Sequence, residues 1–234
     1  MTDVLERRMT RGAVELRAAD DGTPRIGGYA AKFNKLSQNL GGFVERIQPG
    51  FFDKSRDAGW SGVMARYNHD LLLATTAARS LRLALDSTGL DYEADLLDDS
   101  ASQRVFALVE RGDVHQSSFA FYTFEDEWGM TEAGFPLRTL ISGQLVDVAP
   151  VDQPAYLDTS TGLRSLAEQR SMDPAEVKAL AEAGDLSKIL TTPPAVIDLG
   201  ARGGDSATEE PGATGDSWTR LLPLRRALEM NTAD

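Results

Sequence analysis

The 234-residue chain contains no cysteine and only two histidines, His69 and His115. Without cysteine the chain can form neither a disulfide, nor a catalytic thiol, nor a thiolate metal site. The absence also fits an intracellular compartment. Two histidines without cysteine argue against a zinc site, and they restrict imidazole catalysis to two positions.

Long apolar runs and basic clusters are also absent. No stretch approaches the ~20 apolar residues that a membrane-spanning helix needs, and the charged start of the chain lacks the apolar core of a signal peptide. The formal net charge is −12 and the basic residues are scattered, so we expect no nucleic-acid partner. There is no phosphate-binding loop, Gly-x-Ser-x-Gly elbow or His-Glu-x-x-His helix. We therefore expect neither a cofactor nor a metal ion.

Short segments of alternating polarity make up most of residues 13–150. The clearest pair, residues 81–85 and 90–96, flanks a turn at Asp86-Ser87-Thr88-Gly89 and predicts a hairpin. A helix is predicted after the cap residues Asp98, Asp99 and Ser100, and it should stop at Gly112. The other predicted strands span residues 13–19, 25–33, 42–47, 63–67, 118–128, 135–141 and 144–150, with turns near residues 129–134 and at Gly143. This pattern predicts a mainly β protein with a few helices (α+β), as a mostly antiparallel barrel or sandwich.

The composition changes after about Tyr156. Residues 173–183 have the pattern of a helix capped by Asp173. Residues 200–217 are rich in Gly, Ser, Thr, Asp, Glu and Pro, which predicts a disordered acidic linker, and residues 218–230 could form a short amphipathic segment. We therefore predict a domain over residues 1–160 and a tail over residues 161–234.

The stretch from Gly112 to Phe121 is the first candidate for chemistry. Ser117 and Ser118 stand where a charged helical segment gives way to an apolar, aromatic strand. A serine at the start of a buried strand can be held rigidly, as a nucleophile must be. The alternative is that both serines are ordinary residues whose hydroxyls bond to nearby backbone. The residues alone leave both interpretations open.

A hydroxyl nucleophile also needs an imidazole base and a group that orients the base. His69 follows the predicted strand 63–67, between Asn68 and Asp70, and is either such a base or a surface turn residue. Asp147 lies within the apolar run Leu-Val-Asp-Val-Ala. A carboxylate buried there needs a hydrogen-bond partner, such as a histidine N–H, unless its side chain faces outward.

Four segments follow one another along the chain. The first is Gly-Tyr-Ala-Ala-Lys-Phe-Asn at 28–34, and the second is Tyr-Asn-His-Asp at 67–70 with residues 80–83 and 89–96 after it. The third is Val-Glu-Arg-Gly-Asp-Val-His-Gln-Ser-Ser-Phe-Ala-Phe at 109–121, and the fourth is Leu-Val-Asp-Val-Ala-Pro-Val-Asp-Gln-Pro-Ala-Tyr at 145–156. In this order they resemble the prohead (capsid-maturation) serine proteases of tailed bacteriophages, a family similar in fold to herpesvirus assemblin. The resemblance covers about residues 13–160, and it implies a closed antiparallel β-barrel of the herpesvirus-protease type.

Matched residue by residue, the resemblance implies that His69 is the general base, Ser118 the nucleophile and Asp147 the acidic third member, where the family often has Glu. The chain departs from the family pattern in places. Ser117 replaces a frequent Met, so two serines compete for one role, and His115 has no counterpart, which suggests a helix-end or loop residue. Residues 74–76 read Ala-Thr-Thr instead of the usual Gly-Arg-Thr, and Ala149 stands where Ser is common.

The resemblance further implies a serine endopeptidase that cleaves the scaffold segment of the major capsid protein, and itself, during prohead maturation. It would act in the host cytoplasm inside assembling procapsids, and the likeness to the herpesvirus proteases suggests a homodimer. Two other functions stay open: a catalytically inactive scaffold or assembly module on the same fold, and a serine esterase.

Overall fold

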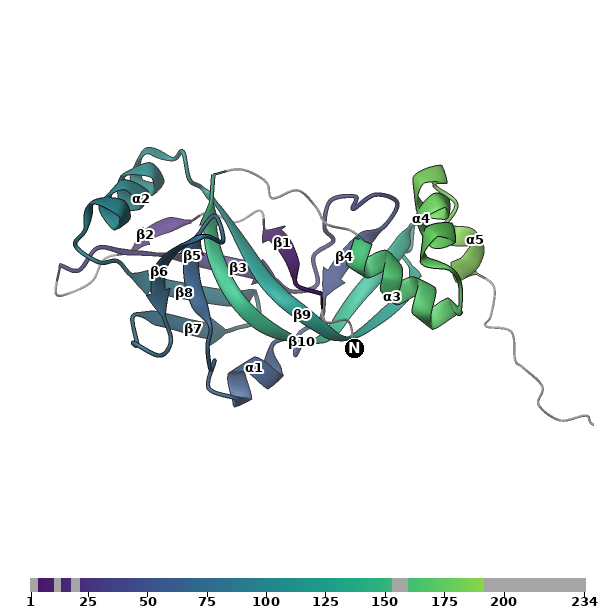
Figure 1. Cartoon of the computed structure of the whole chain (residues 1–234), viewed down its shortest axis with the longest axis horizontal. Helices are drawn as coiled ribbons and strands as arrows, with labels where there is room; N and C mark the ends of the chain where they lie inside the picture. Colours follow the sequence, from purple (N-terminus) through teal and green to yellow (C-terminus); the bar gives the residue numbers. More distant parts are fainter. Residues whose placement is uncertain (1–3, 11–13, 18–21, 153–159, 192–234) are drawn as a thin grey trace, which may run out of the picture. The chain divides into compact units, whose positions relative to one another are not determined.

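The computed structural model describes residues 4–10, 14–17, 22–152 and 160–191 (Figure 1). Two β-sheets form the larger part of the regular secondary structure among these residues, and five helices accompany them. The predicted linker at 200–217, the segment at 218–230 and the end of the fourth resemblance segment, residues 153–156, lie outside the described residues.

The first sheet is built on a long antiparallel hairpin, β9 (Gln116–Met130) and β10 (Pro136–Val151). β1 (Glu6–Thr10) pairs antiparallel with β9 at one side of the hairpin. On the other side, β10 pairs in parallel with β4 (Val44–Ile47) near its start and with β5 (Met64–Tyr67) near its end. β6 (Leu71–Thr75) then follows β5 as an antiparallel neighbour.

The second sheet is antiparallel throughout, in the order β2 (Glu15–Arg17), β3 (Arg25–Lys32), β8 (Gly89–Asp95) and β7 (Leu81–Leu85). β7 and β8 confirm the hairpin that the alternation predicted. The main core cluster takes buried side chains from both sheets, including Ile26 and Tyr92 of the second sheet and Phe119 and Phe121 of the first. α1 (Asp53–Asp57) follows two more buried rings, and Phe51 meets Phe121 edge to face at 5.4 Å.

The prediction of a mainly β chain with a few helices is confirmed, but the prediction of a closed barrel is wrong. Among the described strands neither sheet closes: β1 and β6 end the path of the first sheet, and β2 and β7 end the second. Where β1 approaches β3, the link is a side-chain hydrogen bond, 2.5 Å from the Thr10 hydroxyl to the Ala30 carbonyl. Alternating polarity shows which face of a strand is buried, but it does not show how sheet edges meet.

Local capping signals bound two of the described helices, α2 and α4. In α2 (Ser100–Arg111), the Asp99 carboxylate accepts from the Ser102 N–H at 2.7 Å, and Gly112 ends the helix at φ +88°. Three further helices follow the sheets: α3 (Ser160–Arg170), α4 (Pro174–Ala183), which Asp173 caps as predicted, and α5 (Ser187–Leu190). They share a second core cluster with Leu40 and Phe43. The domain boundary at residue 160 stays a prediction.

Three sheet features differ from the sequence-based prediction, and the first is β6, since no strand was predicted at residues 71–75. β1 was not predicted, because Glu6, Arg7 and Arg8 read as a charged surface segment. Gly143 does not end a strand: it lies inside β10, at a shift of register against β9. A side chain there would come within 2.3 Å of the Phe51 ring, so this glycine permits close packing of a bent strand.

Candidate active site

Ser117 and Ser118 lie at the start of β9 and point to opposite sides of the strand, as neighbouring residues of a strand do. The Ser117 hydroxyl lies 3.2 Å from the Tyr92 hydroxyl in the main core. Burial raises the pKa of that tyrosine to about 12, so it stays protonated. The Ser118 hydroxyl lies on the other side, beside His69. The structure therefore places Ser118, and not Ser117, next to an imidazole.

His69 occupies the turn between β5 and β6. The Asp70 N–H donates to the Tyr67 carbonyl at 3.0 Å, and the two central residues have positive φ, +54° at Asn68 and +62° at His69. These are the features of a type I′ turn, which suits the twist of a β-hairpin. Non-glycine residues adopt this conformation at a cost on the order of 1–3 kcal/mol, so the surroundings must hold it in place.

Contacts with the end of β10 hold this turn. The Asn68 N–H donates to the Pro150 carbonyl at 3.0 Å, and the Asn68 side-chain oxygen accepts from the Asp152 N–H at 3.2 Å. The Tyr67 hydroxyl donates to the Asp152 carboxylate at 2.7 Å. Since the two residues before His69 are tied to the end of β10, the imidazole is held close to the side chains of that strand.

Asp147 lies on β10 just after a shift of register between Leu145 and Asp147. Such an irregularity re-aims the side chains next to it. The residue is 5% exposed, so the alternative of an outward-facing aspartate does not hold. Its neighbour on one side is Met64 of β5, which leads to the His69 turn, and on the other side Ala120 of β9.

The three predicted side chains form one chain of short contacts. His69 Nδ1 lies 2.6 Å from Asp147 Oδ1, and His69 Nε2 lies 2.7 Å from Ser118 Oγ. A carboxylate can only accept, so Nδ1 carries the proton and donates to Asp147, which leaves Nε2 as an acceptor for the Ser118 hydroxyl. A hydroxyl, an imidazole and a carboxylate in this order can transfer a proton away from an attacking oxygen.

Ser118 has a second acceptor within reach. Its hydroxyl donates to the Arg8 backbone carbonyl of β1 at 3.0 Å. A hydroxyl has one hydrogen, so the carbonyl competes with His69 Nε2 for it. Ser118 is also fully buried, with β1 paired alongside it and Met9 as its direct neighbour.

β1 also takes part in a group of buried charges that the sequence analysis did not find. We call it the buried ion cluster, and its members come from β1, β4, β9 and β10: Glu6, Arg8, Glu45, Asp126 and Arg138. Burial alone would raise the pKa of Glu6, but Arg138 and Arg8 outweigh it and hold that pKa below its usual value. The sequence signal was the run Glu-Arg-Arg at 6–8, whose partners are distant in sequence.

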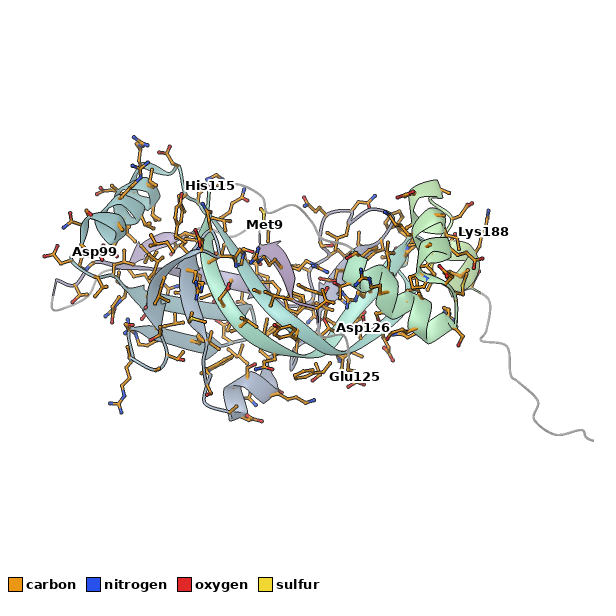
Figure 2. The ribbon with its side chains drawn as sticks, in the orientation of Figure 1. Met9, Asp99, His115, Glu125, Asp126 and Lys188 are labelled. Atoms are coloured by element: carbon orange, nitrogen blue, oxygen red, sulfur yellow. The ribbon has the colours of Figure 1, made fainter. Side chains whose placement is uncertain are left out.

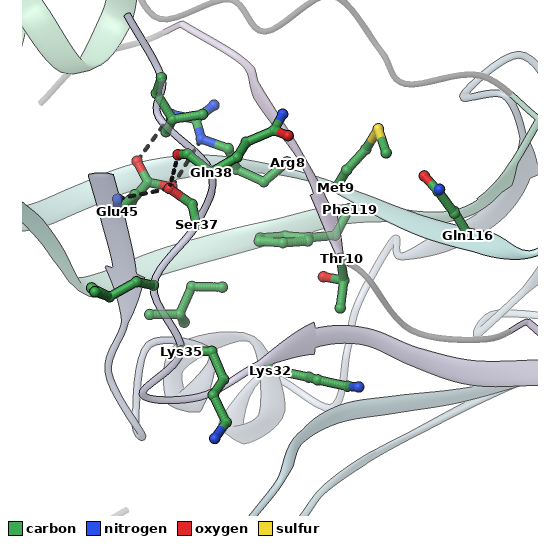
Figure 3. Close-up of a pocket in the computed structure, with 13 residues that line it drawn as sticks. Arg8, Met9, Thr10, Lys32, Lys35, Ser37, Gln38, Glu45, Gln116 and Phe119 are labelled. Carbon is green, nitrogen blue, oxygen red and sulfur yellow. Dashed lines mark hydrogen bonds and ion pairs between the residues drawn. The ribbon is translucent and has the colours of Figure 1, made fainter. Parts of the chain in front are cut away.

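A cavity of about 590 Å³ lies on the other side of β1 (Figure 3). Arg8, Met9 and Thr10 line it, together with Gln116 and Phe119 of β9. None of the three side chains His69, Ser118 and Asp147 is among its lining residues. The cavity therefore borders β1 and the start of β9 without opening onto the three side chains.

The other histidine takes no part in the contacts of His69 with Ser118 and Asp147. His115 is exposed just before β9, and Figure 2 shows it away from Asp126 and the far end of the hairpin. Its imidazole contacts the Gln116 side chain at 3.3 Å. This is the loop position that the sequence analysis suggested.

Within the described ranges, no three His, Asp or Glu side chains come close enough together to hold a metal ion. None of the described helices is both long and apolar enough to span a membrane.

The family model for the caudovirus prohead serine protease matches residues 12–176, which is more than half of the chain. The chain belongs to this family, and it is therefore a phage protease of the prohead stage of capsid assembly. Among solved structures, the capsid assembly protease of bacteriophage T4 is similar at 10% identity and a TM-score of 0.43, covering 64% of this chain and 97% of that chain. No curated protein matches the chain.

Proposed function

We propose that the chain is a serine endopeptidase with Ser118 as nucleophile, His69 as general base and Asp147 as the group that orients the base. The observation that carries the proposal is the position of the imidazole, 2.7 Å from the Ser118 hydroxyl and 2.6 Å from the Asp147 carboxylate. Membership of a serine protease family supports the same roles.

In this mechanism His69 Nε2 takes the proton of Ser118 as Oγ attacks the carbonyl carbon of the scissile peptide bond. The imidazolium that forms keeps its hydrogen bond to Asp147, whose charge stabilises it. His69 then gives the proton to the leaving amine, and an acyl group remains on Ser118. A water molecule, deprotonated by the same imidazole, hydrolyses this ester and restores the hydroxyl.

We propose as substrates the scaffold segment of the major capsid protein and the chain itself, cleaved inside assembling procapsids in the host cytoplasm. The family to which the chain belongs acts at the prohead stage, which supports a capsid protein as substrate. The division into a protease domain over residues 1–160 and a tail over residues 161–234 belongs to this proposal, as does a homodimer.

Co-expression of the chain with its cognate coat protein, followed by mass spectrometry of the fragments, tests the proposal. Ser118→Ala should reduce cleavage of both proteins by at least about 10³-fold, since it removes the attacking oxygen. Ser117→Ala is the matched control, because it removes a neighbouring hydroxyl that contacts Tyr92 instead of His69. Undiminished cleavage by Ser118→Ala would reject the assignment, and loss of cleavage with Ser117→Ala alone would move it by one residue.

One observation favours the inactive assembly module as a second candidate: Ser118 is fully buried. A fluorophosphonate, which reacts with activated serines, separates the two functions in assembled particles. Labelling at Ser118 supports the protease. Intact particles that carry unlabelled Ser118 and uncut coat protein would support the module.

A further inference from the structure

We infer that β1 (Glu6–Thr10) occupies the edge of β9 at which a substrate peptide pairs, so that β1 must leave before Ser118 can act. This inference rests on the proposed function of Ser118. Peptides in extended conformation bind many proteins by adding a strand to a sheet edge. β1 has this form: it pairs antiparallel with β9 over five residues, with Met9 opposite Ser118 and Arg8 opposite Phe119.

The backbone of β1 lies where a substrate backbone would lie, but its carbonyl group is not placed for attack by Ser118. Attack requires the serine oxygen to approach a carbonyl carbon. Here the Arg8 carbonyl presents its oxygen, 3.0 Å from the Ser118 hydroxyl, and competes with His69 Nε2 at 2.7 Å for the one hydroxyl proton. A hydrogen bond to Arg8 would use the proton that His69 has to remove, and Ser118, with Met9 of β1 as its direct neighbour, is fully buried.

The surroundings of β1 leave room for a strand to exchange. β1 is the outermost strand of its sheet among the described residues, and the 590 Å³ cavity lies along its other side. Gln116 and Phe119, which flank the serine pair on β9, also line this cavity. Removal of β1 would therefore join the cavity to Ser118.

The charges of β1 also permit its release. Glu6 and Arg8 form an ion pair with each other at 2.7 Å, so together they carry no net charge out of the buried ion cluster. Arg138 would keep Glu45 at 3.0 Å and Asp126 at 2.5 Å as partners. No buried guanidinium would be left unpaired, which is the costly outcome when one partner of a buried ion pair is removed.

A reversible disulfide between β1 and β9 tests the inference in the full chain. Arg7 and Ala120 are direct neighbours across the two strands. Cα atoms of such neighbours are about 4.5–5.5 Å apart, within the range of a disulfide. The chain has no other cysteine, so the double variant Arg7→Cys/Ala120→Cys can form one bond only. Ser118 labelling by a fluorophosphonate should fall at least about tenfold on oxidation and return on reduction.

The control is Leu16→Cys/Ile26→Cys, which joins the edge strand β2 to β3 in the other sheet. Oxidation of this variant should leave labelling unchanged. Equal labelling of the oxidised and reduced Arg7→Cys/Ala120→Cys variant would overturn the inference and leave the proposed function standing. Absence of Ser118 labelling in every protein, the wild type included, would overturn both.

A milder variant shows whether release of β1 limits labelling. Thr10→Val removes the hydrogen bond from β1 to Ala30 while keeping the size of the side chain. Loss of one hydrogen bond should raise the released population, and with it the labelling rate, about fivefold. Thr139→Val, which alters a buried threonine on β10 that accepts from Arg46, is the control and should label at the wild-type rate. An unchanged rate with Thr10→Val would contradict the inference.

Discussion

The two sheets carry charged networks of similar geometry in opposite surroundings. The buried ion cluster of the first sheet has contacts of 2.5–3.0 Å between side chains that are 0–6% exposed. On the second sheet, five contacts of 2.6–3.1 Å and one of 3.9 Å join side chains that are 20–41% exposed. We call this second network the surface ion ladder, and its members are Arg17, Arg25, Arg82, Asp91, Glu93 and Asp95.

The difference shows that distance alone says little about the importance of an ion pair. In the ladder, water and salt screen the charges, and each pair contributes little. In the cluster, every charge depends on its partners, because a lone buried charge is very unfavourable. The cluster therefore determines where β1 lies, and β1 in turn covers Ser118.

The largest effect is expected from removal of the central charge of the cluster. Arg138→Met leaves Asp126 without its cation, and Glu6 and Glu45 with Arg8 alone. We expect the free energy of unfolding in urea to fall by about 3–5 kcal/mol. Arg46→Met, which alters a half-buried arginine of β4, is the control and should cost far less. A loss below about 1 kcal/mol with Arg138→Met would show that the buried ion cluster contributes no more to the free energy of unfolding than the surface ion ladder does.

A smaller effect is expected on acidification. Hydrogen bonds from Arg82 and Arg25 outweigh partial burial and lower the pKa of Asp95 from 3.8 to about 2. A carboxylate with a depressed folded pKa stabilises the fold above its unfolded pKa, and this contribution is lost as the pH falls. As the pH falls from 3.8 to 2, protonation of Asp95 should lower the free energy of unfolding by about 1–2 kcal/mol. Urea unfolding should show a shallower pH slope in this window for Asp95→Asn. Equal pH slopes for the wild type and Asp95→Asn would contradict the depressed pKa of Asp95.

Glu6 should act in the same direction within the cluster. Its pKa is also depressed, from 4.5, because Arg138 and Arg8 outweigh burial. Its stabilisation is therefore present above pH 4.5 and is lost as the pH falls through the lower folded pKa. Since Glu6 is part of β1, acid should weaken the attachment of β1 to the first sheet. In the surface ion ladder the same acid weakens ion pairs between partly exposed side chains.

The smallest effect is expected from removal of a ladder arginine. Arg82→Met eliminates pairs with Glu93 and Asp95, yet we expect a loss of only about 0.2–1 kcal/mol, because the arginine is 41% exposed. The loss should shrink further in 1 M NaCl, where the Debye length is about 3 Å. Urea unfolding at low and high salt gives both values. A salt-independent loss as large as that of Arg138→Met would contradict the comparison.

The parts of the fold that local signals determine could be predicted from the sequence. Strict alternation around a four-residue turn predicted β7 and β8, and Asp99 with Gly112 bounded α2. β1 could not be predicted in this way. Its inward residues are charged, and they are acceptable in the interior only because Glu45 and Arg138, distant in sequence, meet them there.

The candidate site shows the same division. Residue types and the family resemblance selected His69, Ser118 and Asp147, and the structure brings these side chains together. Their catalytic roles stay a proposal. The position of β1 beside Ser118 could not be predicted from the sequence. No pattern near Glu6 or Arg8 indicates that a backbone carbonyl will accept a hydrogen bond from a serine 110 residues away. The prediction of a closed barrel was wrong for a related reason, because the pairing of sheet edges depends on strands that are far apart in the sequence.

The type I′ turn at Asn68 and His69 makes the length of the loop between β5 and β6 as important for the candidate site as any side chain. Two residues of left-handed backbone bring the ring to the serine, and hydrogen bonds to the last residues of β10 fasten the loop. One inserted residue would keep every functional group in the chain and still swing the imidazole to another face. At this position, counting residues between two strands is a better guide to an intact enzyme than matching their identities.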